Sequence, residues 1–270
     1  MDPLTVPIRP DAAYWSFAAS STFRIAVRPE SLYHFRSEIP WPNHRTRRPS
    51  MLSEQLAALK QYDSATVFNA VALKLGLPNL DYTDHTIRCL MPDMGLVAGF
   101  AVTAEVTTND EDSTALEWMD FYDYVGSQEG PLIAVYKDTD TNPGRGACVG
   151  DGMARAHKRL GVEGFIVDGT VRDLIGIREV GLPVWAWGTV PGHGVFNMNR
   201  FGAPVTVGRL RIRSGDLLLA DGDGCVRVPP EDIDDVLRLA EEVRQKEAAE
   251  FEFYESDSFS LAAMRARRGG

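Results

Sequence analysis

Hydrophobic residues follow two spacings along the chain, and these spacings predict its secondary structure. Apolar positions three and four residues apart predict helices within residues 53–76, with Gly76 as the stop. From residue 95 to residue 190, apolar runs typical of strands alternate with stretches of helical spacing. The predicted strands are 95–108, 130–137, 164–167 and 183–190, and the predicted helices are 113–126, 152–161 and 173–181. This alternation predicts parallel strands joined by helices.

The pattern changes after Pro191. Short apolar runs separated by glycine turns predict a β-rich half, with a hairpin turn at 221–224. Residues 231–254 predict a long helix, because apolar residues form one stripe at Ile233, Val236, Leu237, Ala240 and Val243. We therefore divide the chain into an N-terminal extension (residues 1–50), a main domain (51–230), and a C-terminal helix and tail (231–270).

Composition and charge narrow the class of protein. Of the 270 residues, 44% are hydrophobic and 24% are charged, which is enough apolar material for a substantial core. The formal net charge of −10 argues against nonspecific binding to nucleic acid or to acidic membranes, so neither is expected as a partner. Small anions remain possible ligands where cations are concentrated locally. Residues 1–50 differ from the rest, with seven basic and four acidic residues.

The three cysteines, Cys89, Cys148 and Cys225, are far apart and lack the spacing of metal ligands, so we expect buried free thiols. The first residues show neither a charged n-region nor an apolar h-region. No apolar run approaches about 18 residues. We therefore expect a cytoplasmic protein.

The segment from Val149 to Asp173 contains two glycine turns that each end in charge. If each turn follows a parallel strand and opens a helix, both turns lie at the same edge of the sheet, where open α/β sheets bind ligands. The sequence therefore predicts that Asp151, Arg172 and Asp173 converge in one crevice. A simpler interpretation remains open, in which the aspartates cap helices and Arg172–Asp173 is a surface pair.

These residue types suit the chemistry of 2-oxo acids. A guanidinium such as that of Arg172 binds a carboxylate in fixed orientation. The oxygen of Asp173 is a hard ligand for Mg²⁺ or Mn²⁺, and the ion stabilises the enolate formed when a neighbouring C–C bond breaks. Asp151, directly or through a water, is placed to move the proton that the enolate gains or loses.

At these residues the chain resembles the family that contains the class II pyruvate aldolases and the regulator of ribonuclease activity A (RraA). The matching motifs are GD at 150–151, GVEGFIVDGTVRD at 161–173 and GDLLLADGDGCVRVP at 215–229. The resemblance covers about residues 52–250. It implies an α/β fold of the swivelling three-layer β/β/α type, assembled as a homotrimer or homohexamer with sites between subunits.

The resemblance also implies roles for individual residues. Asp173 would bind the metal, Arg172 pyruvate, and Asp151 the water that transfers the proton. A glutamate from the last helix of a neighbouring subunit would join the metal's outer shell. Glu247 and Glu250 both extend the apolar stripe of that helix, and of the two we prefer Glu247. A helix that has run into solvent is the alternative explanation of both. Gly150, Gly152 and Met153 beside Asp151 are assigned to substrate binding, and Gly152 predicts a roomy pocket.

Two neighbouring segments complete the candidates. His193 lies in a glycine-flanked loop after the last parallel strand and is a candidate substrate contact, with an ordinary loop histidine as the alternative. Asp168 is expected to cap the turn before Arg172, and Trp185 and Trp187 are expected to pack in a strand.

We therefore expect a metal-dependent lyase. Its predicted reactions are cleavage of a 4-hydroxy-2-oxo acid and decarboxylation of oxaloacetate, both through a metal-bound pyruvate enolate. A non-catalytic RraA-like regulatory or binding protein is one alternative. A related metal-dependent dehydratase or tautomerase of a larger oxo acid is another.

Overall fold

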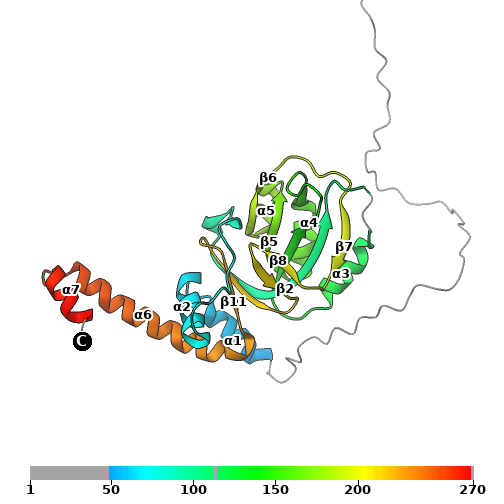
Figure 1. Cartoon of the computed structure of the whole chain (residues 1–270). Helices are drawn as coiled ribbons and strands as arrows, with labels where there is room; N and C mark the ends of the chain where they lie inside the picture. The colour runs from blue at the N-terminus through cyan, green and yellow to red at the C-terminus, as the bar shows by residue number, and fades with distance from the viewer. Residues whose placement is uncertain (1–48, 112–114, 269–270) are drawn as a thin grey trace, which may run out of the picture. The chain divides into compact units, whose positions relative to one another are not determined.

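A computed structural model describes residues 49–111 and 115–268 (Figure 1). The predicted extension of residues 1–50 therefore lies outside the described residues, except for its last two positions. Helices α1 (Pro49–Leu59) and α2 (Ser64–Leu75) account for the first predicted helical stretch. The stretch is divided because Asp63 caps α2, accepting a 2.8 Å hydrogen bond from the backbone N–H of Thr66. Gly76 ends α2 as predicted, with φ +91°.

Within the described residues, nine strands form one sheet in the order β1-β6-β5-β3-β2-β10-β11, with β4 beside β5 and β7 beside β2. Strands β2, β3, β5 and β6 are mutually parallel, and β4 is parallel to β5. The prediction of parallel strands is confirmed. The strands are β1 (Arg88–Cys89), β2 (Val97–Thr107), β3 (Leu132–Asp138), β4 (Ala147–Val149), β5 (Val162–Val171), β6 (Val184–Thr189), β7 (Asn197–Phe201), β10 (Leu217–Ala220) and β11 (Cys225–Val228).

Three helices cover one face of this sheet and a hairpin covers the other. The helices are α3 (Trp118–Gly126), α4 (Asp151–Arg159) and α5 (Leu174–Val180), and the hairpin strands are β8 (Val205–Val207) and β9 (Leu210–Ile212). The two faces follow from the alternation of side chains along a strand. In β3, Ala134 and Tyr136 belong to the core under the helices, whereas Ile133 and Val135 pack with the hairpin. Hairpin, sheet and helices are the three layers of the predicted β/β/α fold.

Two features of the sheet were not predicted from the sequence. The segment 138–151, between a predicted strand and a predicted helix, contains the short strand β4, which the pattern could not reveal because three residues show no periodicity. The region after Pro191 is β-rich as predicted, but β10 and β11 extend the main sheet, because β10 pairs with β2 and β11 pairs with β10. The predicted turn at 221–224 does join these two strands in a hairpin.

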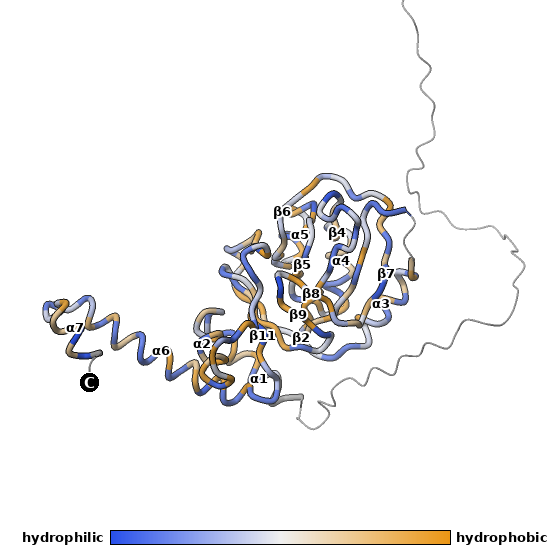
Figure 2. The backbone as a smooth tube through the Cα atoms, viewed as in Figure 1, coloured by the Kyte–Doolittle hydropathy of each residue, from blue (hydrophilic) through white to orange (hydrophobic). Residues whose placement is uncertain are grey.

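The chain after β11 is helical. A 3-10 turn (Pro230–Asp232) leads into α6 (Ile233–Glu255), and α7 (Leu261–Arg268) follows without having been predicted. Ile233, Val236, Ala240 and Val243 are buried, which confirms the apolar stripe. This first part of α6 lies beside α1 and α2, where Figure 2 shows orange hydrophobic stretches. Beyond Val243 most side chains of α6 are exposed.

A second 3-10 turn (Pro92–Met94) precedes β2. In the part of the chain that the structure describes, no helix is both long enough and apolar enough to cross a bilayer. Cys148 and Cys225 are buried free thiols as expected, and Cys89 is half-buried.

Candidate active site

The two glycine turns of the segment 149–173 lie side by side at one edge of the sheet. Strand β4 leads through Gly150 into α4, and β5 leads through Arg172 and Asp173 into α5. The turns are tied together because the backbone N–H of Arg172 donates a 2.9 Å hydrogen bond to the carbonyl oxygen of Val149. The ends of two parallel strands therefore deliver the charged residues to one place.

Two glycines show how closely these residues approach. A Cβ atom at Gly150 would lie 3.0 Å from Oδ2 of Asp173 and 3.2 Å from Nε of Arg172. A Cβ atom at Gly176, in the first turn of α5, would lie 2.7 Å from Cβ and Oδ2 of Asp151. Asp151 thus packs on α5, while Arg172 and Asp173 lie against the residue before Asp151. The three residues therefore lie on adjoining turns, and their convergence in one crevice stays a prediction.

The simpler interpretation is wrong for the helix caps, because neither aspartate side chain caps a helix, but Arg172 and Asp173 do form the exposed pair that it predicts. Asp173 occupies the N-cap position of α5, but its side chain makes no capping hydrogen bond. Its backbone has φ 58° and ψ 38°, a left-handed conformation that is uncommon for residues other than glycine and is often found at functional sites. Asp151 is the first helical residue of α4, and the cap position belongs to Gly150.

The charges around this edge form loose pairs. Nε of Arg172 lies 3.2 Å from Oδ2 of Asp173. Nη2 of Arg155, one turn further along α4, lies 3.7 Å from Oδ2 of Asp151 and 3.5 Å from Oε2 of Glu179. Side chains this exposed form pairs that contribute about 0–1 kcal/mol each to stability. The stability of the fold therefore does not explain why these charged residues lie together at this edge.

The oxygen ligands at this edge suit a hard, hydrated cation. Asp151 and Asp173 offer carboxylate oxygens, and Mg²⁺ is commonly bound by one or two carboxylates while it keeps several waters. Among the described residues, no group of three or more His, Cys, Asp or Glu side chains is arranged to hold a metal ion. As hard oxygen donors, the two carboxylates fit Mg²⁺ or Mn²⁺, whereas a structural zinc site uses mostly thiolate and imidazole ligands.

The residues beside Asp151 have mixed surroundings. Gly152 is exposed and a Cβ atom there would meet nothing within 4 Å, so the predicted roomy pocket stays a prediction. Met153 packs, partly buried, against the core under the helices. The loop of His193 lies alongside β4, because the backbone N–H of Ala147 donates to the carbonyl oxygen of Gly192 at 2.8 Å. The substrate contacts assigned to Gly150, Gly152, Met153 and His193 stay predictions.

The candidate outer-shell glutamates are on α6. Glu247 is half-buried, and the exposed Glu250 accepts a 3.2 Å hydrogen bond from the hydroxyl of Tyr254. Helix α6 packs on α1 and α2, whereas Asp173 begins α5. A contact between Glu247 and Asp173 therefore requires a neighbouring copy of the chain, and it stays a prediction.

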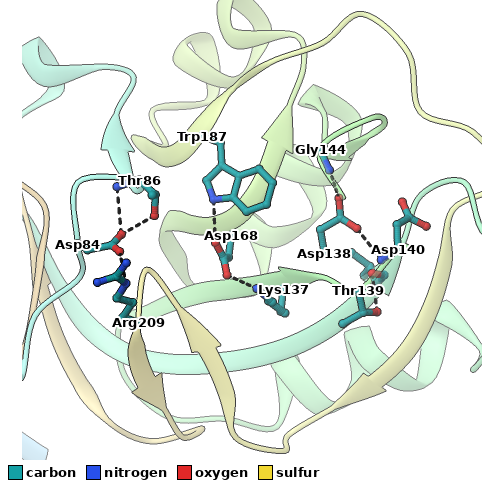
Figure 3. A network of polar contacts seen from close by, with 11 residues as sticks. Asp84, Thr86, Lys137, Asp138, Thr139, Asp140, Gly144, Asp168, Trp187 and Arg209 are labelled. Atoms are coloured by element: carbon teal, nitrogen blue, oxygen red, sulfur yellow. Dashed lines mark hydrogen bonds and ion pairs between the residues drawn. The ribbon is translucent and has the colours of Figure 1, made fainter. Parts of the chain in front are cut away.

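The expectation that Asp168 caps a turn is wrong. Asp168 lies within β5, where Oδ1 accepts a 2.7 Å hydrogen bond from Nε1 of Trp187 and Oδ2 pairs with Nζ of Lys137 (Figure 3). This carboxylate is buried, and both of its oxygens are occupied. The cluster joins three neighbouring strands, so its role is structural, and Trp187 packs as expected.

His157 is a second side chain whose polar atoms are all hydrogen-bonded within the chain, and the sequence did not reveal this role. It lies in the last turn of α4, with Nδ1 2.8 Å from the carbonyl oxygen of Met153 and Nε2 2.9 Å from the hydroxyl of Tyr136. Burial among aromatic rings lowers the pKa of His157 to about 4, so the ring is neutral at pH 7. A neutral ring with both nitrogens bonded serves packing, not catalysis.

Arg155 is the charged residue at this edge that the sequence interpretation missed. Its signal was its position four residues after Asp151, which places both side chains on one face of α4.

Known proteins resemble the chain across the region that builds this edge. A family model described as RraA-like, Aldolase/RraA, matches residues 64–227. A Halalkalibacterium halodurans protein named "Putative 4-hydroxy-4-methyl-2-oxoglutarate aldolase" is 32% identical over 124 residues, which are 44% of this chain and 56% of that protein. The chain thus spans little more than half the length of this relative.

Two solved structures share the fold. The crystal structure of Streptomyces coelicolor RraAS2, described as an unusual member of the RNase ES inhibitor RraA protein family, is 29% identical with a TM-score of 0.60, covering 74% of this chain and 97% of that one. An uncharacterized protein from Pseudomonas syringae pv. tomato, 23% identical, also has a TM-score of 0.60, with 77% and 94% covered. Because the family model matches more than half of its residues, the chain belongs to the RraA-like (Aldolase/RraA) family.

Proposed function

We propose that the chain is a divalent-metal-dependent lyase that cleaves the C–C bond of a 4-hydroxy-2-oxo acid and releases pyruvate. The proposal is supported by the position of Arg172 and Asp173 against Gly150 and of Asp151 against Gly176, on adjoining turns. None of these side chains serves as a helix cap, and their loose pairs add little stability. The aldolase name of the Halalkalibacterium halodurans relative supports the same reaction class.

Each residue has a distinct part in the proposed reaction. Arg172 binds the carboxylate of the substrate through its guanidinium fork and so fixes the position of the 2-oxo group. Asp173, held in place by its left-handed backbone, supplies a carboxylate oxygen for Mg²⁺ or Mn²⁺. When bound, such an ion supplies positive charge that stabilises a developing negative charge on the keto oxygen.

Asp151 carries the proton, directly or through a water. It accepts the proton of the C4 hydroxyl as the C3–C4 bond breaks, and the electrons of that bond form the enolate of pyruvate. Return of the proton to C3 gives pyruvate, and the other fragment leaves as a carbonyl compound. Decarboxylation of oxaloacetate follows the same course, with CO₂ as the leaving fragment and a proton taken up at C3.

A coupled assay tests this proposal. The purified full chain is supplied with 4-hydroxy-4-methyl-2-oxoglutarate or oxaloacetate, and pyruvate is detected through NADH oxidation by lactate dehydrogenase. We expect chelator to abolish pyruvate release and added Mg²⁺ or Mn²⁺ to restore it. Pyruvate release that is unaffected by chelator would contradict the proposed metal dependence. Absence of pyruvate release from either acid would contradict the proposed lyase activity.

A non-catalytic binding protein is the second candidate function. It is favoured by the likeness to Streptomyces coelicolor RraAS2, of which the match covers 97%. In that case the protein would capture a protein partner, no 2-oxo acid would be turned over, and Asp173→Ala would leave partner binding unchanged. Turnover that depends on Asp173 would rule this candidate out as the main function.

The proposed enzyme is a homotrimer or homohexamer, with Glu247 of one copy beside Asp173 of another. Light scattering during gel filtration measures the mass of the assembly. If Glu247 lies in the outer shell of the metal, Glu247→Gln raises the Mg²⁺ concentration needed for half-maximal activity by about 10- to 100-fold. The exposed Glu250→Gln serves as its matched control.

A further inference from the structure

The hairpin of β8 and β9 carries arginines on the face that points away from the main sheet. The inward residues of both strands are buried against that sheet, namely Val205, Val207, Leu210 and Ile212. Arg211 therefore lies on the outward face, opposite Thr206 in the register of the two strands. Arg209 in the turn and Arg213 just after β9 are also exposed. Three exposed arginines at alternate positions thus follow one edge of the molecule's hairpin layer.

The acidic side chains that bond at this hairpin are set back from the surface. Asp81, Asp84 and Asp216 are each 19% exposed, whereas Arg209 is 87% exposed. Asp84 pairs with Nε of Arg209 at 3.1 Å (Figure 3). Asp81 and Asp216 both pair with Arg227, whose side chain is mostly covered. The charge presented on the outer face of the hairpin is therefore mainly positive.

Arg211 and Arg213 have guanidinium groups that are not used within the part of the chain that the structure describes. No ion pair or hydrogen bond of either side chain is found there, and both residues bond through their backbone alone. In contrast, Arg178 and Arg200 each bind both oxygens of one carboxylate. The forks of Arg211 and Arg213 are therefore available to a carboxylate from another molecule.

The spacing of these arginines suits an extended acidic peptide. Alternate residues of a strand point to the same face about 6.6 Å apart, in the hairpin and in an extended peptide alike. Carboxylates at every second position of such a peptide therefore match Arg209, Arg211 and Arg213. Each guanidinium can bind a carboxylate through two parallel hydrogen bonds, which also fixes its orientation.

Two observations favour a protein partner over a nucleic acid. Proteins that bind single strands combine cations with stacking aromatic rings, but residues 203–216 contain no aromatic side chain. The formal net charge of −10 also repels a long polyanion, whereas a short acidic segment on this face meets mainly the local arginines.

We propose that the outer face of the β8–β9 hairpin binds an extended acidic segment of a partner protein, whose alternate carboxylates pair with Arg209, Arg211 and Arg213. The hairpin and the helices α4 and α5 cover opposite faces of the sheet, so this surface lies on the other face from the candidate active site. The inference therefore does not depend on the proposed lyase activity.

Fluorescence anisotropy with the full chain and labelled peptides tests this surface. The probe is a seven-residue peptide with blocked termini, in which three glutamates alternate with serines, and the control peptide has glutamine in place of glutamate. We expect the glutamate peptide to bind at least about tenfold more tightly, and its Kd to rise several-fold when NaCl is raised from about 50 to about 200 mM. Equal binding of the two peptides would overturn the proposal.

Substitution of the two unpaired arginines links binding to this face. Arg211→Gln combined with Arg213→Gln should raise the Kd of the glutamate peptide about tenfold. Lysine at both positions should raise it less, because lysine keeps the charge but lacks the fork. Arg265→Gln removes an exposed charge on α7 and is the matched control, with an unchanged Kd. Tm and pyruvate release should be unchanged in all these variants, and an unchanged Kd in the double glutamine variant would overturn the proposal.

Two further probes test the register and the class of the partner. A seven-residue peptide with glutamates at every third position should bind a few-fold more weakly, because neighbouring carboxylates then point to opposite sides of an extended chain. An oligouridine with three phosphates has the same number of charged groups and should also bind more weakly. Equal binding of the respaced peptide would overturn recognition by strand register, and tighter binding of the oligouridine would overturn the choice of a protein partner.

Discussion

Two groups of charged side chains lie within a few residues of each other along β5, and they differ in how their hydrogen bonds are satisfied. Asp168 is buried, and its two oxygens bind Lys137 and Trp187. Four residues later, Arg172 and Asp173 are about one-third to one-half exposed and make only a loose pair with each other. A charged group whose hydrogen bonds are all made within the chain stabilises the fold, whereas a charged group at a sheet edge with few hydrogen bonds is available to a ligand.

The same contrast runs along α4. His157 has both ring nitrogens bonded and is fully buried, while Asp151 and Arg155 at the start of the helix keep polar atoms exposed. One helix therefore has a candidate functional first part and a structural last turn. Substitutions at the two kinds of position should separate stability from activity.

The largest expected effect is the loss of activity in Asp173→Asn. Asparagine tolerates the left-handed backbone but lacks the anionic oxygen, so kcat/KM should fall about a thousandfold, or about 4 kcal/mol. The free energy of unfolding should change by less than about 0.5 kcal/mol. The coupled pyruvate assay and urea unfolding measure the two quantities. Asp223→Asn, an exposed carboxylate in the β10–β11 turn, is the control.

The next effect is acid destabilisation through His157. Burial lowers the pKa of His157 from 6.5 to about 4, so below about pH 6.5 the unfolded chain binds a proton that the folded chain excludes. This contribution to stability is complete above pH 6.5 and is lost as the pH falls toward 4, by on the order of 3 kcal/mol.

Urea unfolding at about pH 7.5 and pH 5 measures the loss. His157→Phe should be less stable at neutral pH, because the hydroxyl of Tyr136 loses its partner, but it should lack this part of the pH dependence. An identical pH dependence in the variant would show that other groups cause the acid effect.

Breaking the saturated cluster should lower stability without lowering the turnover of folded molecules. Asp168→Ala leaves the indole N–H of Trp187 and the ammonium of Lys137 without their acceptor, at a cost of roughly 2 kcal/mol in unfolding free energy. Differential scanning calorimetry and kcat measured well below the Tm would check this. A large fall in kcat at unchanged Tm would show that Asp168 takes part in the reaction. The distinction between buried structural charges and exposed functional charges would then not hold.

The smallest effect comes from two glycine substitutions that sharpen the geometry. Gly176→Ala places a Cβ atom 2.7 Å from Cβ of Asp151, so Asp151 must shift and kcat/KM should fall about tenfold. Gly152→Ala introduces the same atom into open space and should raise stability by about 0.5–1 kcal/mol, since alanine favours the helix. Equal activity of the two variants would mean that the exact position of Asp151 is unimportant.

The accuracy of the sequence prediction followed the length of each element. Helices α4 and α5 and the parallel strands were predicted because their apolar spacing extends over whole elements. Strand β4 was missed, since three residues carry no period. Asp168 was misassigned because its partners, Lys137 and Trp187, come from other strands and are distant in sequence.

The sequence by itself determined the layered α/β class, the order of the central elements, and the grouping of Asp151, Arg172 and Asp173 after two glycine turns. Those features depend on local periodicity and on the rule that parallel strands end at a common edge. Only the tertiary structure decided which polar groups have hydrogen-bond partners within the chain. Hydrogen bonding depends on atoms brought together from separate strands and helices. Asp168 therefore has both oxygens bonded, whereas the guanidinium groups of Arg155 and Arg172 are partly exposed and loosely paired.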